Sequence, residues 1–129
     1  MLYIFLSYKD WSLPEPPNVM EQHETVTARA QGRDGYICSA GLESFTSATT
    51  VRVRASKAAV TDGPFAETKE VIAGYDVVEC ASREEAIACA RRRMQLEAEA
   101  LRDLPELSSA LRARAETYAI EVRPLFVWG

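Results

Sequence analysis

The single histidine, His23, is the side chain best suited to proton transfer, because the unperturbed pKa of imidazole lies near neutrality. Val19, His23, Val26 and Ala30 recur at spacings of four, three and four, which predicts one apolar face of a helix. His23 is therefore expected to point inward. It is either an acid/base or ligand-binding group, or a core histidine hydrogen-bonded to backbone or to a carboxylate.

Asp62 opens a charged stretch, residues 62–70, which reads Asp-Gly-Pro-Phe-Ala-Glu-Thr-Lys-Glu. An aspartate before glycine favours a tight turn, because its carboxylate bonds nearby backbone. The same carboxylate can orient His23 and stabilise its imidazolium, as carboxylate partners of catalytic histidines do. The two roles are compatible, and His23 with Asp62 form the candidate catalytic pair.

Further candidates are expected on the open face of a sheet. Residues 49–54 alternate valine with arginine, and residues 120–123 alternate aliphatic with charged side chains. If the aliphatic side chains face the helices, the charged ones face the open side. There they either pair with one another or bind an anionic ligand through an arginine fork. The candidate ligand-binding residues are Arg52, Arg54, Phe65, Glu67, Lys69, Glu70, Tyr75 and Arg123.

These candidates also have structural explanations. Phe65 is expected to plug the core or a dimer interface, and Tyr75 either packs there or presents its hydroxyl to a cleft. The glutamates at 67 and 70 either pair with the arginines at 52 and 123, or join Lys69 as a solvated cluster or the rim of a pocket. The run Arg91–Arg93, with glutamates after it, is typical of a solvated helix face.

Composition predicts one soluble domain, with 129 residues, 47% apolar and 26% charged. The net charge of −4 argues against nonspecific nucleic-acid binding. No apolar run approaches the ~20 residues of a membrane span, and no basic region precedes the first strand as in a signal peptide.

The three cysteines, Cys38, Cys80 and Cys89, lack metal-type spacing and are expected as reduced core residues of a cytoplasmic protein. One histidine and scattered cysteines offer no metal cage. No phosphate loop or nucleophile elbow is present, so no cofactor is expected.

Hydrophobic periodicity predicts an α+β fold. Helices are expected from the capping motifs at Asn18 and Ser82. The strands are expected at 1–8, 36–41, 49–54, 57–61, 71–79 and 118–123. Without the small hairpin strands the order is β-α-β-β-α-β, a ferredoxin-like antiparallel sheet with the helices on one face. The first strand is apolar on both faces and the tail at 125–128 is apolar, which favours a symmetric dimer through the other face.

The stretch 62–70 resembles the signature of the YCII-related family, in its DGPF-domain branch. The opening residues 3–8 are similar to the family's first strand, residues 50–54 precede the signature as in relatives, and residues 121–124 close the domain. The resemblance implies a dimeric α/β barrel in a superfamily that includes cofactor-free lyases, isomerases and dehalogenating enzymes. It also implies a His–Asp dyad, with the histidine on the first helix close to His23.

Two functions follow as alternatives for the single domain 1–129. The first is a cofactor-free lyase, dehydratase or isomerase that binds a small organic molecule and uses His23 with Asp62. The second is a noncatalytic binding or regulatory module, for example a partner of an extracytoplasmic-function sigma factor, since some members of the branch resemble such partners. The extra helical segment at about 91–116 departs from the short loop of relatives and offers a surface for a protein partner.

Overall fold

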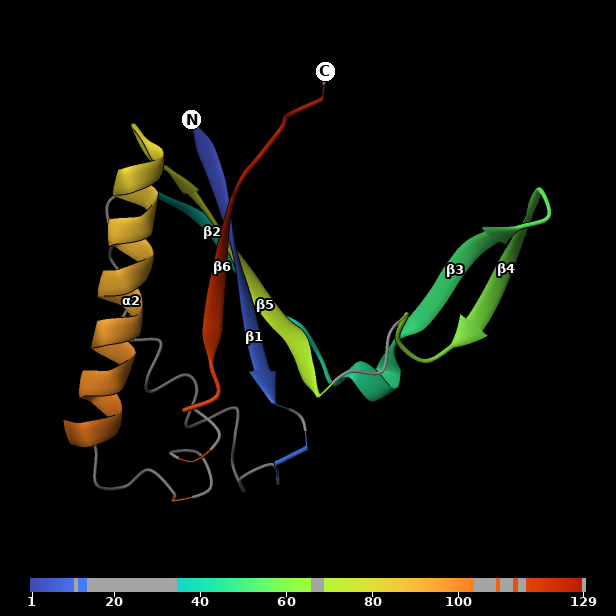
Figure 1. Ribbon diagram of the computed structural model, residues 1–129, viewed down its shortest axis with the longest axis horizontal. Coiled ribbons are helices and arrows are strands. Elements are labelled where there is room, and N and C mark those ends of the chain that lie inside the picture. The colour runs from blue at the N-terminus through green and yellow to red at the C-terminus, as the bar shows by residue number, and fades with distance from the viewer. Residues whose placement is uncertain are drawn as a thin grey trace.

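The computed structural model describes residues 1–10, 12–13, 35–65, 69–103, 109, 113 and 116–128. Four strands form the main sheet: β1 (Leu2–Asp10), β2 (Tyr36–Gly41), β5 (Glu70–Glu79) and β6 (Ala119–Pro124). Their order is β2-β5-β1-β6, and all neighbours are antiparallel (Figure 1). Each crossover thus skips one strand, which is the ferredoxin-like arrangement. The predicted fold class is confirmed, and the dimeric barrel stays a prediction.

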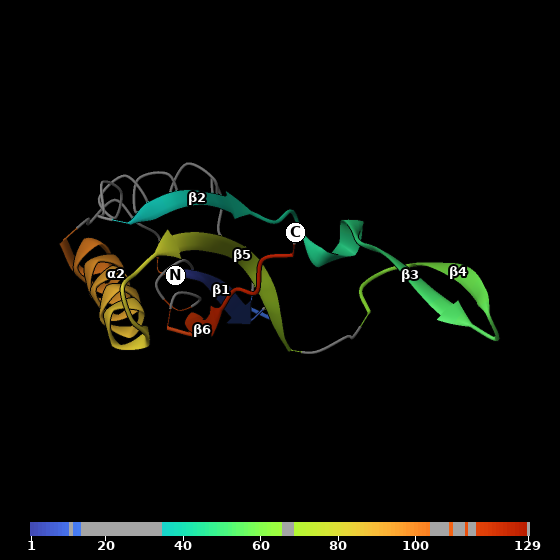
Figure 2. The same ribbon diagram turned by 90° about the horizontal axis from the view of Figure 1, so that it is seen from above.

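The core lies between this sheet and one helix, α2 (Arg83–Asp103). It consists of Tyr3, Phe5, Val78, Cys80, Ala86, Cys89 and Ala90, with Tyr36, Ile120 and Val122 packed against it. Alternation along the strands sends these side chains to the face that α2 covers (Figure 2). The prediction that the aliphatic residues of β6 face the helix side is therefore confirmed.

The helix α2 begins at the predicted capping motif. The amide of Glu85 donates to the Ser82 hydroxyl oxygen (3.2 Å), and the Glu85 carboxylate accepts from the amide of Ala81 (2.6 Å). Apolar spacing along α2 predicts a buried stripe of Ile87, Ala90, Met94, Ala98 and Leu101. Ala90 is buried in the core as predicted, but Ile87 is 41% exposed, and Ala86 and Cys89 are buried in its place. Small residues line the contact, so the prediction was right at Ala90 and wrong at Ile87.

The predicted segment 91–116 begins as a continuation of α2, which runs without a break to Asp103. Residues 109 and 113 are also helical, and the rest of 104–115 lies outside the described residues. The first predicted helix, which carries His23, lies outside them too. None of the helices that the structure describes is long and apolar enough to cross a bilayer.

A separate hairpin is formed by β3 (Thr49–Arg54) and β4 (Lys57–Asp62), which follow the short 3-10 helix η1 (Phe45–Ser47). The hairpin stands away from the main sheet, on the side opposite α2 (Figures 1 and 2). Val51 and Val53 are 65% and 75% exposed, so the expectation that these valines face the helices was wrong. The reason is connectivity: β3 pairs only with β4 in the described chain and joins no helix-covered sheet.

The other face of the main sheet carries mostly apolar side chains. By register these are Leu2, Ile4, Leu6 and Tyr8 of β1, Tyr75 and Val77 of β5, and Cys38 and Ala40 of β2. We call this surface the open face. Cys38 is exposed there, so its prediction as a core residue was wrong, whereas Cys80 and Cys89 are buried as predicted.

A glycine inside a strand pattern predicts a weak point or a bulge, and Gly74 lies at a β-bulge. The register of β1 against β5 shifts after Ser7, which pairs with Gly74. A Cβ at Gly74 would lie 2.7 Å from the carbonyl oxygen of Ala40, so only glycine permits this close pairing with β2. A bulge of this kind bends its strand and increases the local twist.

Candidate functional site

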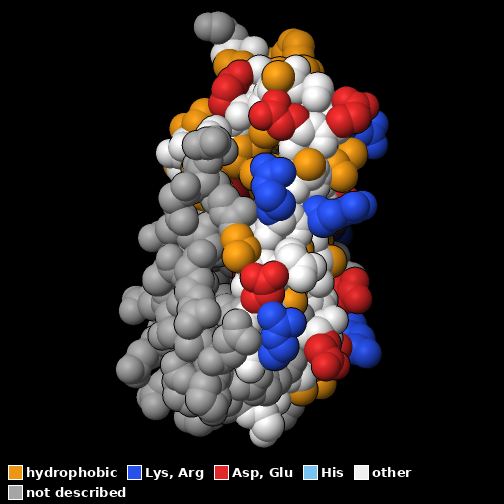
Figure 3. Space-filling view, turned by 90° about the vertical axis from the view of Figure 1, so that its left-hand side faces the viewer, with side chains coloured by type: hydrophobic (Ala, Val, Ile, Leu, Met, Phe, Trp, Pro, Cys, Tyr) orange, Lys and Arg blue, Asp and Glu red, His pale blue; other side chains and the backbone are white. Residues whose placement is uncertain are grey.

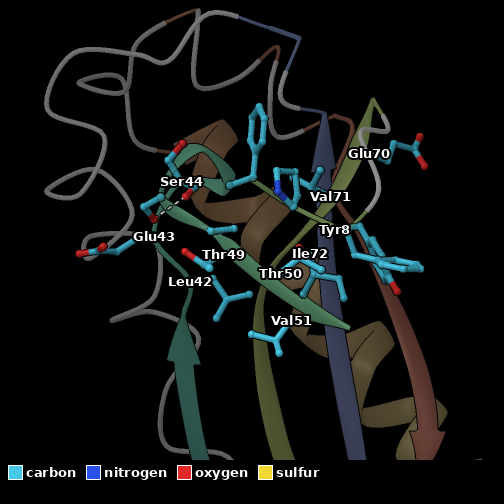
Figure 4. Close-up of a pocket in the computed structure, with 15 residues that line it drawn as sticks. Tyr8, Leu42, Glu43, Ser44, Thr49, Thr50, Val51, Glu70, Val71 and Ile72 are labelled. Atoms are coloured by element: carbon cyan, nitrogen blue, oxygen red, sulfur yellow. Dashed lines mark hydrogen bonds between the residues drawn. The ribbon is translucent and has the colours of Figure 1, made fainter. Parts of the chain in front are cut away.

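An open cleft of about 770 Å³ lies where the hairpin meets the end of the main sheet (Figure 4). Its wall comes from β1, the loop after β2, η1, and the starts of β3 and β5. The lining is mainly apolar: Leu42, Phe45, Val51, Pro64, Phe65, Val71 and Ile72. The side chains of Leu42, Val51 and Ile72, from three different segments, thus border one space (Figure 4).

Three hydrogen bonds to backbone carbonyls hold the walls of the cleft together. The amide of Gly63 donates to the carbonyl of Ala48 (2.8 Å), and the Thr50 hydroxyl donates to the carbonyl of Gly63 (2.8 Å). The amide of Leu42 donates to the carbonyl of Ala73 (2.8 Å). Gly63 has φ +101°, a conformation that glycine adopts most readily. The glycine of the signature therefore fixes the angle at which the hairpin leaves the sheet.

Polar groups lie along the edge of the cleft. Tyr8, Ser44, Thr49 and Thr50 supply hydroxyls to the lining. Among the described residues, the charged side chains of the lining are Glu43 and Glu70, which are both acidic. This lining is complementary to an apolar body with a hydrogen-bonding or cationic group.

The structure describes one of the two candidate catalytic residues, Asp62. Asp62 ends β4 opposite Thr49, a cleft residue, and by alternation shares a hairpin face with the cleft-lining Val51. Its carboxylate is exposed and makes no hydrogen bond or ion pair within the described chain. His23 lies outside the described residues, so the His23–Asp62 pair stays a prediction.

Phe65 lines the cleft and is 76% exposed. It does not plug the core of this chain, which corrects one of its two expected roles, and its role in a dimer interface stays a prediction. The guanidinium carbon of Arg52 lies 5.0 Å from the centre of the Phe65 ring, a cation–π contact across the rim of the cleft. Arg52, Arg54 and Lys57 occupy the hairpin face opposite Val51.

Lys69 lies beside the end of β1, where its Nζ is 3.4 Å from Oδ2 of Asp10. The hydroxyl of Ser12 donates to Oδ1 of Asp10 (2.6 Å), and the amide of Ser12 donates to the same oxygen (2.8 Å). The Ser12 hydroxyl is the main cause that lowers the pKa of Asp10, although burial opposes it. Lys69 and Asp10 thus help to anchor the signature stretch to the sheet.

Tyr75 and Arg123 lie on the open face rather than in the cleft lining. Arg123 contacts its strand neighbour Glu121, with Nη1 3.9 Å from Oε1, and both side chains are exposed. Glu67 lies outside the described residues. The predicted network between the glutamates and arginines around the signature therefore stays a prediction.

A buried polar cluster on the other side of the sheet was missed by sequence reasoning. Arg93 was placed on a solvated helix face, but its side chain is only 16% exposed and donates to Asp76 and to the Tyr36 hydroxyl. Tyr36 also donates to Asp76, and Arg93 Nε lies 3.5 Å from Oε1 of Glu97. Burial raises the pKa of Glu97, against the opposing effect of Arg93. We call Tyr36, Asp76, Arg93 and Glu97 the α2 cluster.

One sequence signal pointed to the α2 cluster. Asp76 sits between Gly74 and Val78 in strand alternation, so a buried β5 face requires a cationic partner for it. Arg91 and Arg92 are exposed as predicted, and the outward side of α2 shows interspersed acidic and basic side chains (Figure 3). The cluster joins α2 to the sheet and lies away from the cleft.

The described side chains include no group of three His, Cys, Asp or Glu residues that could hold a metal ion. Comparison with known proteins places the sequence more closely. It matches the family model for the YCII-related domain over residues 1–105, which includes the hairpin, the cleft and α2. It is also 35% identical over 136 aligned positions to an uncharacterized protein of Rhizobium meliloti (strain 1021), covering 99% of this chain and 94% of that relative. The chain belongs to the YCII-related family.

Proposed function

We propose that this protein binds a small, mainly apolar organic molecule in the cleft at the root of the hairpin. The supporting observation is the cleft itself, whose volume of about 770 Å³ falls within the ~300–1,000 Å³ of small-molecule sites. Its apolar wall and few polar groups also match the usual composition of such sites. Because Glu43 and Glu70 both carry negative charge, the cleft favours a neutral or cationic ligand over an anion.

Binding of a neutral aromatic amine, N-phenyl-1-naphthylamine, tests this proposal through its fluorescence. We expect saturable binding to the full chain and at least tenfold weaker binding to Ile72→Asp, which places a charge in the apolar wall. Ile37→Asp is the matched control, because Ile37 is an exposed strand residue outside the lining. Equal affinity in the two variants, or no saturable binding to the wild type, would refute the cleft as the site.

We further propose that the bound molecule undergoes proton transfer by His23 and Asp62 in a homodimeric, cofactor-free barrel. The position of Asp62 on the cleft-side face of the hairpin supports its role. Once a substrate is found, His23→Ala and Asp62→Asn should each lower its turnover by at least a hundredfold, the lower end of the ~10²–10⁴-fold range for general acid–base catalysis. Both variants should keep wild-type affinity for N-phenyl-1-naphthylamine.

Unchanged turnover in a folded His23→Ala protein would contradict the catalytic part of the proposal and leave ligand binding intact. The alternative is then a regulatory module that senses the ligand. Its test is a purified extracytoplasmic-function sigma factor titrated with the full chain, where ligand-dependent binding supports regulation and its absence opposes it.

A further inference from the structure

We propose that the β3–β4 hairpin is an arm that clasps a second copy of this chain. In this arrangement the valine face of the arm, Val51, Val53, Ala58 and Val60, packs against the copy that covers the open face of the main sheet. The proposal goes beyond ligand binding, since it concerns how two copies hold each other. It deepens the proposed homodimer by assigning the arm a contact in it.

The valine face of the arm is uncovered. Val51, Val53 and Val60 are 65%, 75% and 68% exposed on one face of a two-stranded hairpin. A two-stranded hairpin with no further layer is marginally stable in water. Valine is enriched where a strand face is packed, so three aligned valines indicate a surface that is buried in the working protein.

The valine face of the arm begins beside the open face of the main sheet. Val51 of the arm borders the cleft together with Ile72, which pairs with the open-face residue Tyr8, so the root of the valine face adjoins the side of the sheet that α2 does not cover (Figure 4). The hydrogen bond from the Gly63 amide to the Ala48 carbonyl ties together the two segments at the root of the arm. A body seated on the open face would therefore meet the valine face as well.

Net charge favours a second copy of this chain as the body that meets the valine face. The arm, residues 49–62, carries three basic residues and Asp62, which gives it a formal charge of +2. Since the whole chain has a charge of −4, the remainder carries −6. The three basic side chains lie on the face opposite the valines, so they would flank the contact, where a cationic arm is attracted to the anionic body of another copy. The same anionic body repels a nucleic acid. A second copy of this chain is the occupant that satisfies both the apolar face and the charge.

The arm enlarges the face that a second copy could cover. At ~3.3 Å per residue and ~4.8 Å between strands, six residues of the four-stranded face cover about 380 Å², and the arm adds about 190 Å². A stable interface needs about 800 Å² of accessible surface from each partner. The flat area of the sheet face is less than half of this, and with the arm it rises to about 570 Å². The arm supplies about a third of the combined face, and a two-fold axis would let each copy clasp the other.

The oligomeric state of the full chain tests the arm. Sedimentation equilibrium should give twice 14.3 kDa for the wild type. Val53→Lys with Val60→Lys should raise the dimer Kd at least tenfold, because the lysines would be buried against the partner. Ala59→Lys with Thr61→Lys is the matched control, which adds the same charge to the opposite face and should change the Kd less than threefold.

A wild-type monomer, or equal dimer affinity in the two lysine variants, would overturn the proposal. Circular dichroism shows whether the Val53→Lys, Val60→Lys variant folds. If it does not fold, a variant with a shortened arm tests the proposal instead. Residues 51–60 are replaced by Asn-Gly, which forms the two-residue turn that a hairpin prefers. The Thr49–Asp62 pair remains in this variant. Wild-type dimer affinity in it would overturn the arm, and a tenfold loss would support it.

Probe binding separates the arm from the cleft. If only the proposal about the arm is wrong, N-phenyl-1-naphthylamine still binds in an Ile72-dependent way, and the valine substitutions leave the dimer unchanged. If only the proposal about the cleft is wrong, the wild type does not bind the probe, and the valine substitutions still weaken the dimer.

Discussion

Replacing Arg93 with leucine removes the cation of the α2 cluster and should destabilise the protein strongly. Asp76 is 2% exposed and accepts from both Arg93 and Tyr36, so the substitution leaves a buried carboxylate with a single neutral donor. Breaking a buried pair by removing one partner costs about 3–5 kcal/mol. The Arg93 side chain is 16% exposed, and some access of water to the site favours the lower end, about 3 kcal/mol.

Urea denaturation measures this loss. A domain of this size has about 5–15 kcal/mol of stability, and an m-value of about 1–3 kcal/mol/M converts the expected loss into a midpoint shift of about 1–3 M. Arg92→Leu is the matched control, because Arg92 is the exposed neighbour on the same helix and should change stability by less than about 0.5 kcal/mol.

The double variant Asp76→Val with Arg93→Leu completes the cycle. Replacement of a buried pair by packed apolar residues is often neutral, so the double variant should recover most of the stability that Arg93→Leu loses. The reasoning would be refuted if Arg93→Leu were as stable as Arg92→Leu. It would also be refuted if the double variant lost more stability than the two single variants, Asp76→Val and Arg93→Leu, lose together.

Three further outcomes are expected. Burial holds the pKa of Glu97 above its unfolded value. The stabilising contribution of Glu97 is therefore full below the unfolded pKa and is lost as pH rises through the folded pKa. Urea titrations should show that Glu97→Gln is more stable relative to the wild type at pH 7 than at pH 4. Ala55 and Ser56 turn the hairpin with φ of 49° and 64°, so replacing them with Asn-Gly should relieve about 1–2 kcal/mol and raise hydrogen-exchange protection of the hairpin amides about five- to thirtyfold. A thiol reagent should label Cys38 quickly in dilute native protein and more slowly as concentration drives a dimer through the open face, and the two buried cysteines should react only after unfolding.

Local signals in the sequence were sufficient for the strands, the capping motif of α2 and the bulge at Gly74. Each depends on alternation or spacing within a few residues, and the structure confirms each within one or two residues. The strand order followed because β-α-β crossovers permit few arrangements once the two hairpin strands are set aside.

Signals that depend on distant partners were read less well. Arg93 follows two exposed arginines and reads as solvated, yet Asp76, which is far from it in the chain, fixes it inside. The valines of β3 alternate as in a half-buried strand, but alternation does not state which sheet a strand joins. Helix periodicity placed both Ile87 and Ala90 of α2 in the core, but close packing on the sheet buries Ala90 with the small residues Ala86 and Cys89 and leaves Ile87 exposed.

The signature stretch has a structural role that connects the cleft to the arm, and Gly63 carries it. A Cβ at Gly63 would meet no atom within 4 Å, so Gly63→Ala should act through its φ of +101° alone, at a cost of about 1–2 kcal/mol. Because the strain lies at the root of the hairpin, the chain can relieve it by re-aiming the arm and keep the sheet and α2 intact. We therefore expect Gly63→Ala to weaken both N-phenyl-1-naphthylamine binding and dimerisation, with little change in the urea midpoint of the core. Wild-type values for both, or a core destabilised as far as Arg93→Leu destabilises it, would show that the signature does not set the angle of the arm.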